Sequence, residues 1–247
     1  MAEGIVQSVT WRLAASLLAL VAASLAAGDA APPWPPFLPE RAALPADIAA
    51  LVERTWGHRT WSRTVRGRPA RAPLDLYMAL VDAPDVTAAA ARFRELARHE
   101  VRALGEDWYE ADDGDGSRGQ YRVLVREARR RVMLSWGEHS SGLVGTIRGS
   151  ALTELSLEPR GGDVAQELTA HVLIESRVAA ALARMLLVLF GGIADRRLRQ
   201  AFASAGQVAE WAADQPAEFC QWLGRAPVPA ERRARVAGLV RGCGETS

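Results

Sequence analysis

The chain has 247 residues, of which 49% are hydrophobic and 24% are charged, and this composition is typical of a globular protein rather than a disordered one. Its 30 basic and 29 acidic residues leave a formal net charge of +1, which gives no reason to expect a nucleic-acid binder. Every basic residue is Arg, so a P-loop lysine and a Schiff-base lysine are both excluded.

The N-terminus carries an uncharged apolar run at positions 13–27. This run is shorter than the ~20 residues of a typical membrane-spanning helix, but it suits the apolar core of a secretory signal. Arg12 precedes the run and small residues follow it. We therefore expect residues 1–28 to be a signal peptide or membrane anchor, with the rest of the chain exported. The alternative is an apolar helix packed on a cytoplasmic domain.

Residues 29–72 are predicted to be a linker. A Pro-rich stretch at 31–45 predicts an extended tether, and a short helix is expected at 45–56. Residues 58–72 are rich in Arg and are interpreted as a loop. Such a loop near an anchor would be able to contact a membrane surface, although a solvated loop is the simpler interpretation because Arg is abundant throughout the chain.

Residues 73–214 show the pattern of an α+β domain. Leu, Leu, Met and Leu at alternate positions of 74–81 predict a strand, and residues 87–104 predict a continuous helix. About six antiparallel strands are then expected between 108 and 175, followed by one long helix at 177–214.

The C-terminal residues 215–247 are predicted to form a helical extension. They include Cys220 and Cys243, whose spacing matches no metal-binding pattern. The two thiols would be able to form a disulfide in an oxidising compartment and would stay free in the cytosol, so the sequence leaves their state open.

This order of elements predicts an antiparallel sheet with one face against the long C-terminal helix, and an apolar space between them. The stretch DLYMALVDAPDVTAAAARF resembles the first strand and following helices of the START/Bet v 1-like (SRPBCC, polyketide cyclase/dehydrase-like) helix-grip superfamily, which usually has two short helices there. The stretch SALTELSLEPRGGDVAQELTAHVLIES resembles its last two strands. The resemblance covers about residues 73–213. It implies a curved sheet gripping a helix around a cavity for lipids, terpenoids, polyketides or similar molecules.

The strand and helix patterns predict which side chains line this cavity. They are aliphatic and aromatic residues from the expected strands and from the long helix. The predicted ligand-binding residues are Leu76, Met78, Tyr121, Val123, Trp136, Leu155, Val172, Met185 and Leu189.

Glu138 is the candidate for chemistry. It has the same strand parity as Leu134 and Trp136, which points it into the predicted cavity. A buried carboxylate has a raised pKa and is able to act as a general acid or to bind the polar end of a ligand. Tyr121 is the other residue expected to bind that polar end. The alternative is a solvated residue at the end of a strand.

No metal and no cofactor are expected. The four His residues are dispersed, and His139 and His171 have the parity predicted to face solvent. The acidic run at 112–115 predicts a turn rather than a calcium loop, because the Glu required at loop position twelve would fall on Val123 or Leu124.

Three functions remain open from the sequence. The first is an exported carrier or sensor of a hydrophobic small molecule. The second is an enzyme of the cyclase or hydrolase type that uses Glu138. The third is an interaction module whose cavity is filled by its own side chains. Fold class alone does not choose among them.

Overall fold

A computed structural model describes residues 33–142, 145–176, 199 and 203–243. All the elements below belong to one compact unit, Trp34–Ser247. The predicted signal peptide or anchor and most of the predicted long helix, including Met185 and Leu189, lie outside the described residues, so export stays a prediction. Within the described residues, no helix is long and apolar enough to span a membrane.

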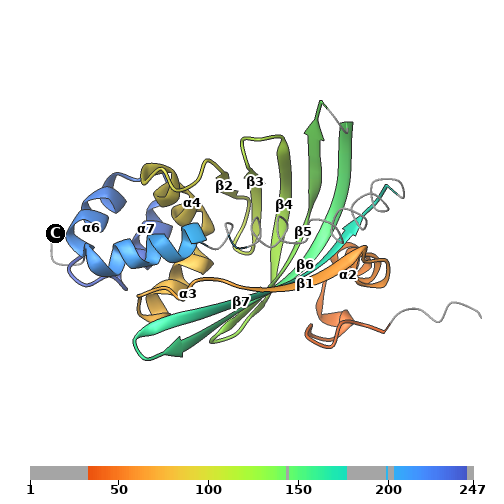
Figure 1. The fold of residues 1–247 in the computed structure, drawn as a ribbon, viewed down its shortest axis with the longest axis horizontal. Coiled ribbons are helices and arrows are strands. Elements are labelled where there is room, and N and C mark those ends of the chain that lie inside the picture. The colour runs from red at the N-terminus through yellow and green to blue at the C-terminus, as the bar shows by residue number, and fades with distance from the viewer. Residues whose placement is uncertain (1–32, 143–144, 177–198, 200–202, 244–247) are drawn as a thin grey trace, which may run out of the picture. The chain divides into compact units, whose positions relative to one another are not determined.

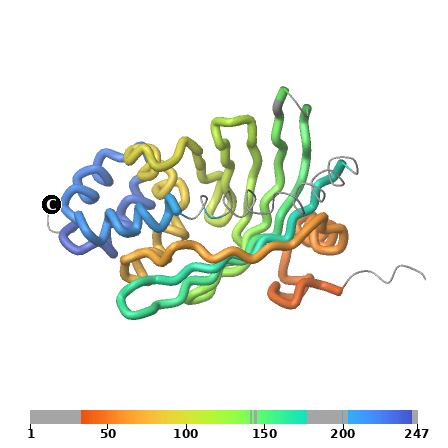
Figure 2. The backbone as a smooth tube through the Cα atoms, viewed as in Figure 1, coloured from red at the N-terminus to blue at the C-terminus, as the bar shows by residue number. Residues whose placement is uncertain are grey.

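The centre of this unit is a seven-stranded antiparallel sheet with the order β1-β7-β6-β5-β4-β3-β2. The first and last strands are neighbours, and Figure 2 shows them running side by side. The strands are β1 (Trp61–Arg66), β2 (Glu100–Ala103), β3 (Trp108–Asp112), β4 (Ser117–Arg126), β5 (Arg130–Ser141), β6 (Gly145–Arg160) and β7 (Asp163–Ile174).

The described helices precede, interrupt and follow the strands. Two short helices connect β1 to β2, and the C-terminal region is helical (Figure 1). The elements are η1 (Arg41–Ala43), α2 (Ala46–Gly57), α3 (Leu74–Asp82), α4 (Pro84–Phe93), a helix over 203–214, α6 (Pro216–Arg225) and α7 (Ala230–Ala237).

The strand predicted at 74–81 is wrong, because this segment is helix α3. Five consecutive residues of α3, from Leu76 to Leu80, are buried. When almost every residue of a short segment is apolar, a period of two does not distinguish a strand from a buried helix. The predicted continuous helix at 87–104 is also wrong, since α4 ends at Phe93 and β2 begins at Glu100.

The first strand of the sheet is β1, which lies in the segment interpreted as an Arg-rich loop. That interpretation is wrong because β1 pairs with β7 along its whole length. In β1 only Val65 is buried. An edge strand tolerates charged and polar side chains, so its sequence does not show the apolar alternation of a covered strand.

The sheet is apolar on both faces, and each face has its own core. On one face, Met133, Leu155 and Leu168 pack with α3, α4 and the C-terminal helices. On the other face, Leu134 and Leu152 pack against α2 and the segment from Trp34 to Leu44. We call the first the inner face and the second the outer face. Helix α2 therefore covers the face of the sheet opposite the C-terminal helices.

A disulfide joins Cys220 of α6 to Cys243 beyond α7, which answers the question that the sequence left open. The bond closes a loop of 23 positions around the C-terminal helices. Trp211, Phe219 and Trp222 pack together beside it and connect this region to the inner-face core.

We expect Cys220→Ser to lower the free energy of unfolding by about 3 kcal/mol, because the disulfide restricts the unfolded chain. The measurement is urea denaturation of both proteins with and without dithiothreitol. Reduction should shift the wild type to the midpoint of the variant and leave the variant unchanged. Equal midpoints of the oxidised wild type and the variant would show that the bond contributes nothing to stability.

Candidate functional site

Three glycines lie side by side in the middle of the sheet. Gly119 of β4 pairs with Gly137 of β5, which pairs with Gly149 of β6. A Cβ at Gly119 or Gly137 would lie 2.4 Å from a carbonyl oxygen of the neighbouring strand, and a Cβ at Gly149 would lie 2.6 Å from the oxygen of Leu173. Glycine inside a strand marks such a close approach of backbone, and it also leaves the face without side chains. We call these residues the glycine row.

A hollow of about 600 Å³ lies along the glycine row. The strand register identifies the inner-face residues that flank the row. Tyr121, Ser135, Ala151 and Val172 form the cross-strand row on one side. Ser117, His139 and Ile147 form the row on the other side. The first row and the glycines are mostly small or apolar, so the hollow offers an apolar floor with polar groups at one end.

The structure places the predicted cavity residues in several different environments. Tyr121 and Val172 line the hollow. Val123 pairs with Met133 across the β4–β5 ladder, so the two side chains share the inner face. Leu76, Met78 and Leu155 belong to the adjacent inner-face core. Ligand binding by these residues stays a prediction.

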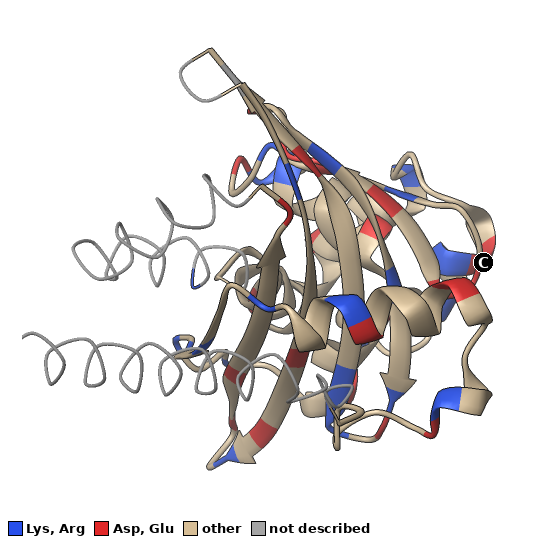
Figure 3. Ribbon diagram, turned by 90° about the vertical axis from the view of Figure 1, so that its right-hand side faces the viewer, with Lys and Arg blue, Asp and Glu red and all other residues tan. Residues whose placement is uncertain are grey.

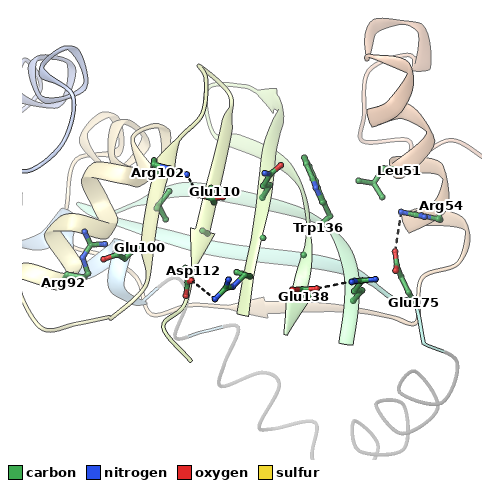
Figure 4. A pocket seen from close by; sticks show the side chains of 18 residues that line it. Leu51, Arg54, Arg92, Glu100, Arg102, Glu110, Asp112, Trp136, Glu138 and Glu175 are labelled. Atoms are coloured by element: carbon green, nitrogen blue, oxygen red, sulfur yellow. Dashed lines mark hydrogen bonds and ion pairs between the residues drawn. The ribbon is translucent and has the colours of Figure 1, made fainter. Parts of the chain in front are cut away.

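The expected orientation of Trp136 and Glu138 is wrong. Trp136 packs into the outer-face core with α2, and Glu138 accepts a hydrogen bond from Arg148 Nε at 3.3 Å on that same face (Figure 4). Strand alternation shows which residues share a face, but it does not show which face lies against the C-terminal helices. The outer face also carries apolar residues, because α2 packs on it. The apolar residues that share a side with Glu138 therefore did not identify the face that holds the cavity.

A second and larger depression, of about 760 Å³, lies on the outer face between α2 and strands β2 to β6 (Figure 4). Its walls carry paired charges. Arg102 lies 2.6 Å from Glu110, Arg148 lies 3.3 Å from Glu138, and Arg54 of α2 lies 3.5 Å from Glu175. Acidic and basic residues are also interspersed over the strands and helices in Figure 3. The mixed and paired charges of this outer depression suit an apolar ligand less well than the apolar lining of the hollow does.

The polar end of the hollow contains Ser117, His139, Asp113 and His99. Ser117 Oγ lies 3.0 Å from His139 Nδ1. Asp113 Oδ1 accepts hydrogen bonds from the backbone N–H of Ser117 at 2.9 Å and of Asp115 at 2.7 Å. Burial acts to raise the pKa of Asp113, but hydrogen bonds from Ser117 and Asp115 outweigh it and hold that pKa below its ordinary value.

The surroundings of two further polar groups of the hollow favour their uncharged forms. Burial, with the nearby charge of Arg92, lowers the pKa of His99, so its imidazole is neutral at pH 7. Burial and the neighbouring Tyr109 raise the pKa of Tyr121, so its phenol stays protonated. The ring of Tyr121 stacks on that of Tyr109, with the centroids 5.0 Å apart.

His139 and Ser117 were not predicted from the sequence as residues of the hollow. His139 was expected to face solvent because adjacent residues of a strand point to opposite faces and Glu138 was expected to point into the cavity. The available signal was the glycine row, since glycines inside three neighbouring strands mark a place where backbone or a ligand approaches closely. The expectation that His171 faces solvent is also wrong, because its ring stacks on Phe37 and meets Trp56 under the N-terminal segment.

No family model and no curated protein matches the chain. Several solved structures resemble it. One is a conserved protein from Geobacillus kaustophilus, with 17% identity, a TM-score of 0.40, and coverage of 61% of this chain and 93% of that chain. CalU16 from Micromonospora echinospora has 18% identity, a TM-score of 0.36, and coverage of 72% and 87%. Ara h 8.0201 has 12% identity, a TM-score of 0.37, and coverage of 61% and 96%.

Likenesses at these identities and TM-scores decide nothing about function. The sheet itself has the features that the START/Bet v 1-like resemblance implies. The first strand, β1, leads into two short helices. Strands β2 to β6 then follow as successive neighbours in the antiparallel sheet, and the last strand, β7, pairs with both β6 and β1. The helix-grip expectation is confirmed for the α+β class, the antiparallel sheet and the helical C-terminal region.

Proposed function

We propose that this protein binds a hydrophobic small molecule in the hollow along the glycine row. The observation that carries the proposal is the lining of the inner face. Ala151, Val172, Ile147 and Ile174 surround three positions that have no side chain at all. The strands therefore leave an apolar depression where a typical sheet would present packed side chains.

Apolar burial is sufficient to drive such binding. A ligand that buries ~200 Å² of apolar surface in the hollow gains ~5 kcal/mol from leaving water, before the costs of association. Polar groups at one end would orient the ligand rather than supply most of the affinity. The carrier function therefore has stronger support than catalysis by Glu138, whose side chain is paired with Arg148 on the opposite face.

We expect Ala151→Phe to lower the affinity for a neutral apolar probe about tenfold, because the added ring occupies volume that a ligand needs. The measurement is titration of the full chain with N-phenyl-1-naphthylamine, followed by the probe's fluorescence. Arg148→Phe is the matched control, since it places the same ring on the outer face of the same strand. If Arg148→Phe abolishes binding and Ala151→Phe does not, the ligand occupies the outer depression instead.

A further inference from the structure

We propose that His99, Ser117 and His139 form a subsite for a neutral hydroxyl group, so that the preferred ligand is an apolar alcohol or phenol rather than a fatty acid. This inference rests on the proposed function, because it assigns the polar end of a molecule whose apolar body fills the hollow.

His139 has one ring nitrogen engaged and one available to a bound group. Its Nδ1 is engaged with Ser117 Oγ at 3.0 Å. In the part of the chain that the structure describes, its other ring nitrogen, Nε2, has no hydrogen-bond partner. His139 lines the hollow. A ring nitrogen that is fixed in orientation by its partner nitrogen is a defined donor or acceptor for a bound group.

His99, at the same polar end of the hollow, favours its uncharged form. His99 lines the same hollow, and burial lowers its pKa. Tyr121, four residues further along β4 and on the far side of the glycine row, carries a protonated phenol at the other end of the hollow. A neutral imidazole and the hydroxyl group of Ser117 donate and accept hydrogen bonds, which matches a ligand hydroxyl group with its one donor and two acceptor positions.

The distribution of charge around the hollow disfavours an anionic head group. Among the described residues, the arginines of the hollow are Arg118 and Arg148, and both form ion pairs on the outer side, with Asp112 at 4.0 Å and with Glu138 at 3.3 Å. Asp113 stays ionised beside Ser117. A carboxylate head group would lose its hydration beside this anion, which is strongly unfavourable. The charge of Arg92 lies near His99, but the Arg92 guanidinium already donates to the carbonyl oxygen of His99 at 2.9 Å.

The test compares three probes with one ring skeleton on the full-length protein, namely 2-naphthol, naphthalene and 2-naphthoate, by titration calorimetry at pH 7. We expect 2-naphthol to bind about fivefold more tightly than naphthalene, the factor that one net hydrogen bond supplies. We expect ionised 2-naphthoate to bind more weakly than either. Ala151→Phe should weaken all three, which places the probes in the hollow.

Variants then assign the preference to the subsite. His139→Leu should reduce the affinity for 2-naphthol to that for naphthalene while leaving naphthalene binding unchanged. Glu138→Gln, the next residue on the same strand but on the outer face, should keep the fivefold preference. If His139→Leu does not fold, His99→Leu gives the same comparison from outside the sheet's central strands.

The outcomes separate this inference from the proposed function. Equal binding of 2-naphthol and naphthalene, tightest binding of 2-naphthoate, or a preference that survives both His variants would overturn the subsite while leaving the apolar hollow intact. No binding of any probe would overturn the proposed function itself.

Discussion

Asp85→Ala is expected to lower the free energy of unfolding by about 3–5 kcal/mol, the range for removing one partner of a buried ion pair. Asp85 is 4% exposed and Arg232 is 7% exposed. Arg232 Nε lies 3.4 Å from Asp85 Oδ2, and within the described residues the carboxylate oxygens accept no hydrogen bond. Arg232 also donates to Tyr109 Oη at 3.0 Å and to the oxygen of Gly105 at 3.1 Å.

The size of this effect comes from the charge that is left behind. Without Asp85, the guanidinium of Arg232 stays buried in α7 with only neutral partners, and its desolvation is no longer compensated by an anion. The pair also joins α4 to the C-terminal extension. Loss of stability should therefore be accompanied by earlier exposure of the extension to proteolysis.

Urea denaturation measures the effect, and two further variants interpret it. Glu158→Ala breaks an exposed pair with Arg129 and should cost less than about 1 kcal/mol. Asp85→Leu combined with Arg232→Met should recover much of the lost stability, because neither charge is then buried. If Asp85→Ala proves as mild as Glu158→Ala, the buried pair is not what holds α7 to α4.

A second large effect is expected for Gly137→Val, which should cost about 3 kcal/mol and remove binding of apolar probes. Val is favoured over Gly in strands by intrinsic preference, so propensity alone predicts stabilisation. The contacts predict the opposite. A Cβ at position 137 would lie 2.4 Å from the oxygen of Arg118 and 2.7 Å from Cα of Gly119. Strand β4 would have to move away, and its ladder with β5 would weaken.

The matched control for this substitution is Gly224→Ala in α6, where an added Cβ would meet nothing within 4 Å. It should be neutral or slightly stabilising, because alanine is the better helix former. Stability and probe binding are measured on both variants, by urea denaturation and by fluorescence titration. A Gly137→Val protein with wild-type stability would show that the strands are not held as closely as the glycine row indicates.

Much of the sheet could be predicted from local pattern. Alternation over residues 108–175 correctly indicated antiparallel strands, although about six were predicted there and the structure has five, β3 to β7. The same alternation correctly placed Trp136 and Glu138 on one face and His139 on the other. A resemblance in element order also correctly indicated the fold, although it placed the first strand at 74–81, which is helix α3, the first of the two short helices between β1 and β2.

The identity of the two faces could not be predicted in this way. A period of two encodes only which residues share a side, and both sides of β5 carry apolar residues, Met133 on one and Leu134 on the other. The same limit applies to α3, where uniform apolarity removed the difference between a strand and a buried helix. The glycines of the central strands are visible in the sequence, but they indicate a hollow only because they are aligned across β4, β5 and β6. That alignment is known only from the strand register.

By itself, the sequence determined the α+β class, the antiparallel strands, the pairs of residues that share a face and the apolar character of the interior, because these follow from local periodicity and composition. Only the tertiary structure decided which face holds the hollow. That choice depends on α2 covering the outer face, as in the 2.7 Å contact between Thr55 Oγ1 and Ser150 Oγ, which lie 95 positions apart. A contact between segments so far apart leaves no trace in the periodicity of either one.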